Sequence, residues 1–129
     1  MLKSIKYLPE KDRENLKQAV SIILEELYGC ERIILHGRWS RAKYDKVVAH
    51  SVQCADYELL ILVAPGSSVE MTARKLRKAR KRFLRSGAGG ADLLLQATDL
   101  MVFNRYLDES RYLYTCIKRD GVELYSSGQ

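Results

Sequence analysis

Residues 56–85 read DYELLILVAPGSSVEMTARKLRKARKRFLR, and this stretch carries the clearest signals of the fold. It opens with Tyr57–Val63, a largely apolar run that ends before a Pro-Gly pair, which is typical of a buried strand. Either Ser67 or Ser68 can then cap a helix over Val69–Arg85, because a serine hydroxyl accepts a hydrogen bond from an N–H of the first helical turn. A strand followed directly by a helix predicts a protein that mixes both kinds of element.

Predicted helices and strands also alternate on both sides of this stretch. Apolar residues at spacings of three and four predict an amphipathic helix that begins near Pro9 and ends near Tyr28 and Gly29. The other predicted elements are a strand over 32–36, a strand over 92–97, short helices over 100–107 and 109–119 or one broken helix there, and a last strand over 122–125. The sequence therefore predicts an α+β fold, a small mixed β-sheet flanked by helices, formed by one domain over residues 1–129.

Hydropathy and cysteine usage exclude several classes of protein. The longest purely apolar run is 59–64, whereas a membrane-spanning helix needs about 20 residues, so no membrane partner is expected. Cys30, Cys54 and Cys116 are odd in number and lack the spacing of a metal site. Buried free thiols in a reducing cytoplasm are the expected state.

The positive charge is concentrated in one predicted helix. The chain has a net charge of +6, and residues 71–86 alone carry eight lysines and arginines with no acid. The rest of the chain is therefore close to neutral. This basic helix is interpreted in three ways: as a solvated surface, as a site that contacts RNA or DNA phosphates, or as a docking surface for an acidic partner.

Acidic residues at the start of two predicted strands form a candidate metal site. Asp56 and Glu58 share one face of their strand, because side chains alternate along a strand. Mg²⁺ prefers such carboxylate oxygens. Asp92, or alternatively Asp99, could supply a third carboxylate from the next strand, which would permit a site for two Mg²⁺ ions.

Two of these segments together resemble a known family. Residues 33–42 (IILHGRWSRA) and 56–63 (DYELLILV) are similar to the minimal nucleotidyltransferase domains of the polymerase-β superfamily. In that family an apolar strand leads into Gly-Ser-x-Ala-Arg-Gly, and after a loop Ser-Asp-x-Asp opens a second apolar strand. Residues 8–27 resemble the helix that precedes the motif. Residues 112–128 look like the segment after the catalytic sheet in forms fused to a HEPN domain.

The resemblance implies a function and a set of site residues. It implies transfer of a nucleoside monophosphate, with AMP from ATP favoured, to a hydroxyl group of a protein or a small molecule. Relatives include proteins that neutralise HEPN ribonuclease toxins, so a HEPN-domain partner is implied as well. The matching positions are Asp56, Glu58 and Asp92 as catalytic ligands of two Mg²⁺ ions, and Gly37, Arg38 and Arg41 as nucleotide-binding residues.

Three departures from the family pattern favour a second interpretation. Arg38 stands where the family has serine, Ala42 replaces the final glycine, and Glu58 is one methylene longer than aspartate. The alternative is a catalytically weakened or inactive, antitoxin-like binding module that partners a HEPN domain or RNA. His36, at the end of its apolar strand, is interpreted as a hydrogen-bonded core histidine rather than a catalytic base.

Overall fold

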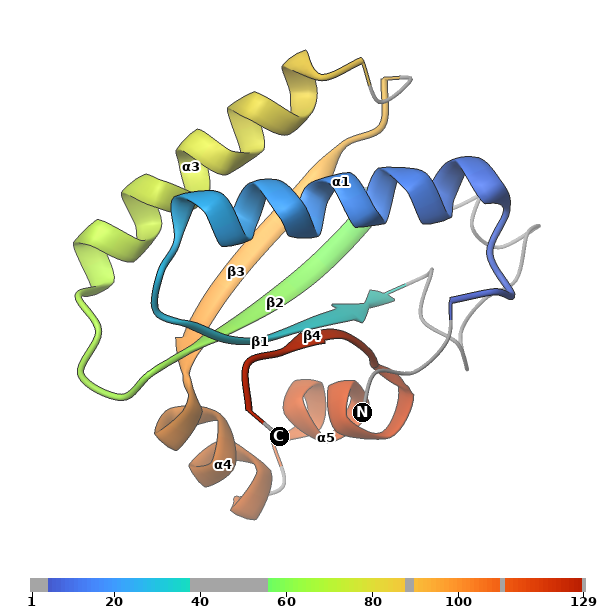
Figure 1. Ribbon diagram of the computed structural model, residues 1–129. Coiled ribbons are helices and arrows are strands. Elements are labelled where there is room, and N and C mark those ends of the chain that lie inside the picture. The colour runs from blue at the N-terminus through green and yellow to red at the C-terminus, as the bar shows by residue number, and fades with distance from the viewer. Residues whose placement is uncertain (1–4, 38–55, 88–89, 110, 129) are drawn as a thin grey trace.

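The computed structural model describes residues 5–37, 56–87, 90–109 and 111–128. Helices and strands follow one another along the chain as the sequence predicts (Figure 1). In order they are α1 (Glu10–Glu26), β1 (Cys30–His36), β2 (Tyr57–Val63), α3 (Val69–Arg85), β3 (Leu93–Asp99), α4 (Leu100–Asp108), α5 (Tyr112–Asp120) and β4 (Val122–Ser126).

The strands form one mixed sheet in the order β3-β2-β1-β4. β1 is antiparallel to both β2 and β4, whereas β2 and β3 are parallel. Parallel neighbours need a crossover connection, which α3 supplies. The predicted α+β fold with a small mixed sheet flanked by helices is therefore confirmed.

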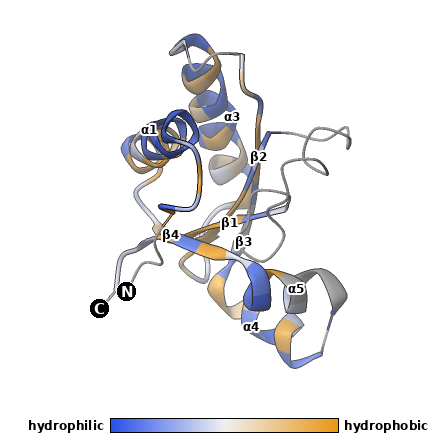
Figure 2. Ribbon diagram, turned by 90° about the vertical axis from the view of Figure 1, so that its right-hand side faces the viewer, coloured by the Kyte–Doolittle hydropathy of each residue, from blue (hydrophilic) through white to orange (hydrophobic). Residues whose placement is uncertain are grey.

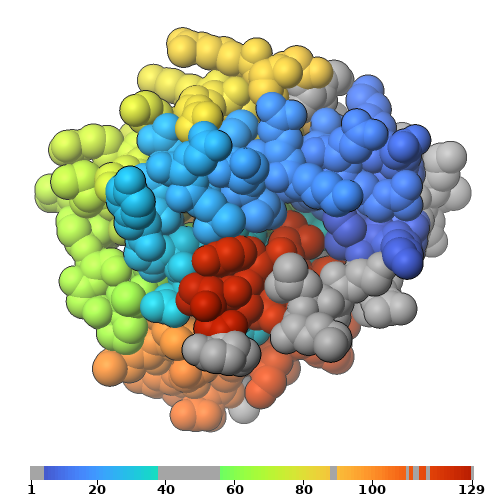
Figure 3. Space-filling view, viewed as in Figure 1, coloured from blue at the N-terminus to red at the C-terminus, as the bar shows by residue number. Residues whose placement is uncertain are grey.

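Helices cover both faces of the sheet. Figure 2 shows the α1–α3 pair and the α4–α5 pair on opposite sides of it, and Figure 3 shows α1 beside α3 on the first of these faces. Along β2, Leu59 and Ile61 pack in the core under α1 and α3, while Leu60 and Leu62 pack in the core under α4 and α5. Burial on both faces explains why this strand is apolar at almost every position rather than at every second one.

The boundaries of several elements differ from the prediction by one to three residues, and the differences at α1 and β1 are linked. α1 ends at Glu26, before the predicted Tyr28 and Gly29, because Leu27 adopts an extended conformation and its side chain enters the core. The chain turns earlier, and β1 begins at Cys30 rather than at Arg32.

Among the helices that the structure describes, none combines the length and the apolar character that crossing a membrane requires.

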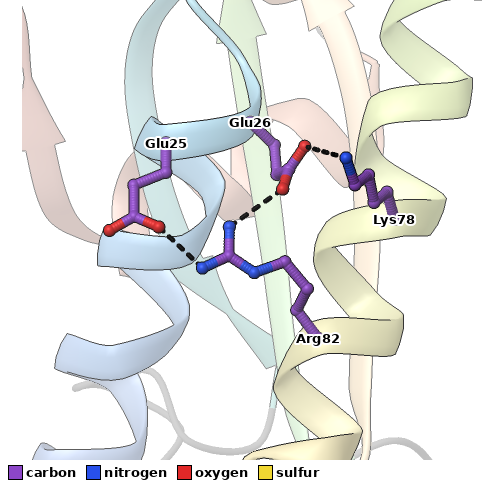
Figure 4. Close-up of polar contacts among 4 residues, drawn as sticks. All are labelled: Glu25, Glu26, Lys78 and Arg82. Carbon is purple, nitrogen blue, oxygen red and sulfur yellow. Dashed lines mark hydrogen bonds and ion pairs between the residues drawn. The ribbon is translucent and has the colours of Figure 1, made fainter.

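Ion pairs join the basic helix to α1 (Figure 4). The Arg82 guanidinium contacts Glu25 at 2.6 Å and Glu26 at 2.8 Å, and Lys78 lies 3.6 Å from Glu26. The hydrogen bond from Arg82 holds the pKa of Glu26 below its usual value. Two basic residues of α3, Lys78 and Arg82, therefore hold this helix against α1.

Tyr57 fixes the start of β2 against α1. Its ring is buried, its hydroxyl donates to the Asp12 carboxylate, and it accepts a hydrogen bond from Asn15 Nδ2 at 3.0 Å. An edge-to-face contact with Phe83, with ring centroids 6.4 Å apart, ties it to α3 as well. Because Tyr57 stands between Asp56 and Glu58, this anchoring sets where the two acidic residues lie.

Candidate functional site at one end of the sheet

Three strands bring the predicted site residues to one end of the sheet. Glu58 pairs across the sheet with His36 at the end of β1, and Tyr57 pairs with Leu93 at the start of β3. Gly37, Asp56, Glu58 and Asp92 therefore lie at the same end, and we call these four residues the strand-end site. Its members come from three separate parts of the chain, as the sequence motifs predict.

Gly37 and Glu58 are in direct contact. Gly37 has a φ of +78°, and a Cβ placed on it would stand 2.7 Å from Cδ of Glu58. Residues with side chains rarely adopt this left-handed conformation, whereas glycine does so readily. The backbone conformation thus favours glycine at the end of β1, and the carboxylate end of the flexible Glu58 side chain fills the space beside it.

Asp56 is tied to the neighbouring strand. Its Oδ2 accepts a hydrogen bond of 2.8 Å from the backbone N–H of Asp92. The Asp92 carbonyl in turn accepts a hydrogen bond of 3.1 Å from the backbone N–H of Tyr57. The Asp56 carboxylate therefore satisfies the backbone N–H of Asp92, the residue directly before β3.

Asp92 is turned toward α3. Its Oδ1 lies 2.7 Å from Nη2 of Arg80 and accepts a hydrogen bond of 2.8 Å from the Leu93 N–H. Arg80 also donates from Nε to the Leu93 carbonyl at 2.9 Å. This role of Arg80 was not predicted from the sequence. Its helical spacing from Leu76 and Phe83 was a signal for it, because that spacing places Arg80 beside the buried stripe of α3.

Asp99 lies at the opposite end of β3. It is the N-cap of α4, where its Oδ1 accepts a hydrogen bond of 2.7 Å from the Val102 N–H. The length of β3, about 20 Å at roughly 3.3 Å per residue, separates it from Asp92. Of the two acidic residues that the sequence left open, only Asp92 belongs to the strand-end site.

His36 is the cross-strand neighbour of Glu58. Its side chain is buried, as expected for a core histidine, but its Nε2 has no hydrogen-bond partner within the part of the chain that the structure describes. Burial lowers the pKa of the imidazole, because the charged form is poorly solvated there. His36 is therefore a neutral group next to the acidic residues.

The fit of these residues to Mg²⁺ can be tested on their side chains. Within residues 5–37, 56–87, 90–109 and 111–128, no three His, Cys, Asp or Glu side chains come together as metal ligands. The backbone positions are suitable, but Glu58 packs on Gly37, Asp56 caps Asp92, and Asp92 pairs with Arg80. As arranged, the carboxylates do not fit a shared Mg²⁺ ion, and the two-metal site stays a prediction.

The predicted nucleotide-binding residues Arg38 and Arg41 lie outside the described residues.

Comparisons with protein-family models, with curated proteins and with solved structures find no match for this chain. Its function must therefore be inferred from its own residues.

Proposed function

We propose that the chain is a nucleotidyltransferase-like domain in which transfer is weak or lost, and that it acts as an antitoxin-like binding module. The observation that carries this proposal is the state of the three carboxylates. Asp56, Glu58 and Asp92 each contact another group of the protein, and among the described residues no three such side chains come together as metal ligands. A two-metal transferase needs these carboxylates to converge on the metal ions.

Relationship to the nucleotidyltransferase family is supported by the position of Gly37. The family resemblance requires the glycine after the first strand to lie beside the acidic motif of the second strand. Here Gly37 has a positive φ and contacts Glu58, and Asp56 and Asp92 are joined by a hydrogen bond. Gly37 would allow close approach of a phosphate to the backbone only once the Glu58 carboxylate had moved aside.

A second candidate function, active transfer, is favoured by the exposure of the Asp92–Arg80 pair. The two side chains are 50% and 46% exposed, and an exposed ion pair contributes only about 0–1 kcal/mol. Even millimolar nucleotide binding corresponds to about 4 kcal/mol, so a bound nucleotide with its metal could turn Asp92 toward Asp56. The reaction would then be transfer of a nucleoside monophosphate, AMP from ATP favoured, to a hydroxyl group of a protein or small molecule.

The partner that we propose for the binding module is a HEPN-domain protein. This proposal rests on the resemblance of residues 112–128 to the corresponding segment of HEPN-fused relatives.

Isothermal titration with ATP and Mg²⁺ tests the proposal on the wild type and on Arg38→Ser, Glu58→Asp and the double variant. Wild-type binding should be weak. Arg38→Ser should restore more affinity than Glu58→Asp, because an arginine occupies the position of the phosphate-facing serine while glutamate can choose another rotamer. Asp99→Asn is the matched control, since it alters a carboxylate at the far end of β3 and should leave binding unchanged.

The outcomes separate the two candidates. If neither single variant nor the double binds ATP with Mg²⁺, the nucleotide site is absent and the function lies in protein contacts alone. If the wild type releases pyrophosphate from ATP, and Asp56→Asn abolishes this release, the chain is an active transferase and the proposal of lost turnover is wrong.

A further inference from the structure

The outer edge of β3 borders a groove that the strand-end site does not use. β3 is the terminal strand of the sheet, and among the described residues it pairs only with β2. Between this edge and α3 lies a groove of about 370 Å³. Because an exposed strand edge presents backbone groups that can pair with another chain, it is a natural binding element.

The register of β3 shows which backbone groups face the groove. The Asp92 carbonyl bonds to Tyr57 of β2, and in a parallel ladder alternate residues bond to the same neighbour. The backbone groups of Leu93, Leu95 and Ala97 therefore point away from β2. Those of Leu93 already contact the Asp92 carboxylate and Arg80, which leaves Leu95 and Ala97 as the outward positions next to the groove.

The walls of the groove are largely apolar. Leu94 is 40% exposed on β3, and Val69 is 83% exposed at the start of α3. Leu95 and Ala97 also line it, and no aromatic side chain does so among the described residues. Stacking of nucleic-acid bases, which relies on aromatic side chains, therefore has no support in this groove.

Charge distinguishes the two ends of the groove. Arg77 and Arg80 line it near the start of β3, whereas Asp99 lines it near the end. In the part of the chain that the structure describes, no ion pair forms at Arg77, unlike Arg80, which contacts Asp92. Arg77, at the basic end of the groove, is thus available to bind an acidic group of a ligand that lies beside Leu95.

We propose that this groove binds an extended, acidic segment of a partner protein, which adds as a strand to the outer edge of β3. Backbone groups of Leu95 and Ala97 would pair with the segment, and its carboxylates would meet Arg77. A second copy of this chain is a poorer occupant, because pairing two β3 edges would bring two basic α3 helices toward one another. The proposal does not depend on nucleotide binding at the strand-end site.

Fluorescence anisotropy with a labelled peptide of alternating valine and glutamate tests the proposal on the full chain. The wild type should bind this peptide saturably and should bind a valine–lysine peptide at least about tenfold more weakly, since like charges oppose association. Ala97→Pro removes an outward N–H and should weaken binding about tenfold or more, while the inward ladder to β2 is kept. Arg77→Glu should weaken it to a similar extent.

Arg85→Glu is the matched control, because it makes the same charge change on the same helix but outside the groove; its affinity should stay within about twofold of wild type. A melting curve checks that Ala97→Pro is folded. If Ala97→Pro is unfolded, the proposal is tested by the binding of Arg77→Glu and by hydrogen exchange of the wild type. The amides of Leu95 and Ala97 should then exchange more slowly when peptide is present.

Three results would overturn the proposal. The first is no saturable binding of the valine–glutamate peptide to the wild type. The second is equal loss in Arg85→Glu and Arg77→Glu with no loss in Ala97→Pro, which would indicate general attraction of polyanions by α3. The third is tighter binding of a single-stranded oligouridylate than of the peptide, with a steep salt dependence, which would make α3 a nucleic-acid surface.

Discussion

The carboxylate of Glu58 lies directly against the backbone of Gly37, and the contact joins the end of β1 to the start of β2. Neither residue can change independently of the other. A side chain at Gly37 would displace the Glu58 carboxylate, and any ligand that approaches the Gly37 backbone must first meet that carboxylate. The positive φ of Gly37 and the position of the Glu58 carboxylate are therefore linked at this end of the sheet.

Gly37→Ala should destabilise the protein for two reasons. The positive φ costs about 1–2 kcal/mol for a residue with a side chain, and the new Cβ must displace Glu58. Gly66→Ala is the matched control, because Gly66 has a φ of +87° but no atom within 4 Å of an added Cβ. Urea unfolding should show a larger loss for Gly37→Ala, and adding Glu58→Ala should remove the difference. Equal losses in the two single variants would show that the contact has no energetic weight.

Tyr57→Phe should lower the free energy of unfolding by about 1–3 kcal/mol, because it removes two hydrogen bonds at a buried position. The hydroxyl contacts Asp12 and Asn15 of α1. Tyr28→Phe makes the same chemical change at a side chain that is 92% exposed, and should have almost no effect. Denaturant titration of both variants measures the difference. A Tyr57→Phe variant as stable as wild type would mean that these hydrogen bonds do not hold α1 to β2.

The ion pairs of Arg82 predict how stability depends on pH. Since Arg82 holds the pKa of Glu26 below its usual value in the folded protein, the stabilisation is complete above the ordinary glutamate pKa. It is lost as the pH falls through the lowered value of the folded state. Arg82→Ala should therefore reduce the melting temperature at neutral pH, and the difference from wild type should shrink in acid. Arg85→Ala is the control, as no ion pair forms at Arg85 among the described residues. A difference for Arg82→Ala that is constant with pH would contradict the prediction.

Cys30 should be chemically inert in the folded protein. Its side chain is buried, and burial raises the pKa of the thiol to about 12. Only the thiolate is nucleophilic, so little reactive form exists near neutrality. In a Cys54→Ser/Cys116→Ser background, an aromatic disulfide reagent should react readily with Cys30 of the protein unfolded in urea. With the folded protein in buffer it should react only very slowly. Rapid labelling under native conditions would show that this part of β1 opens easily.

Much of the fold could be predicted from the sequence, because its strongest patterns have local causes. β2 and α3 have the predicted bounds: the strand is apolar because both its faces are covered, and the helix starts where Ser68 accepts a hydrogen bond from Met71. The end of α1 was predicted too late, because Leu27 continues the apolar helical spacing and enters the core although its backbone is already extended.

The candidate site was harder to predict, because side-chain partners come from distant parts of the chain. Asp92 was favoured over Asp99 because it opens its predicted strand, but only the parallel pairing of β2 with β3 shows that this end lies beside Asp56. The pairing of Asp92 with Arg80 depends on where α3 crosses the sheet. The position of Glu58 relative to Gly37, in contrast, followed from strand alternation and the family resemblance, and the structure places the Glu58 carboxylate beside Gly37.

The pairing of β4 with β1 has a consequence for the order in which the molecule forms. Ile33 pairs with Tyr125, although most of the chain lies between them, and Val122 is part of the main core. During synthesis β3, β2 and β1 have emerged from the ribosome while β4 is still inside it. Contacts between residues so far apart in sequence form slowly. Until β4 is added, the edge of β1 that it covers is unpaired, and an unpaired apolar edge is prone to aggregation.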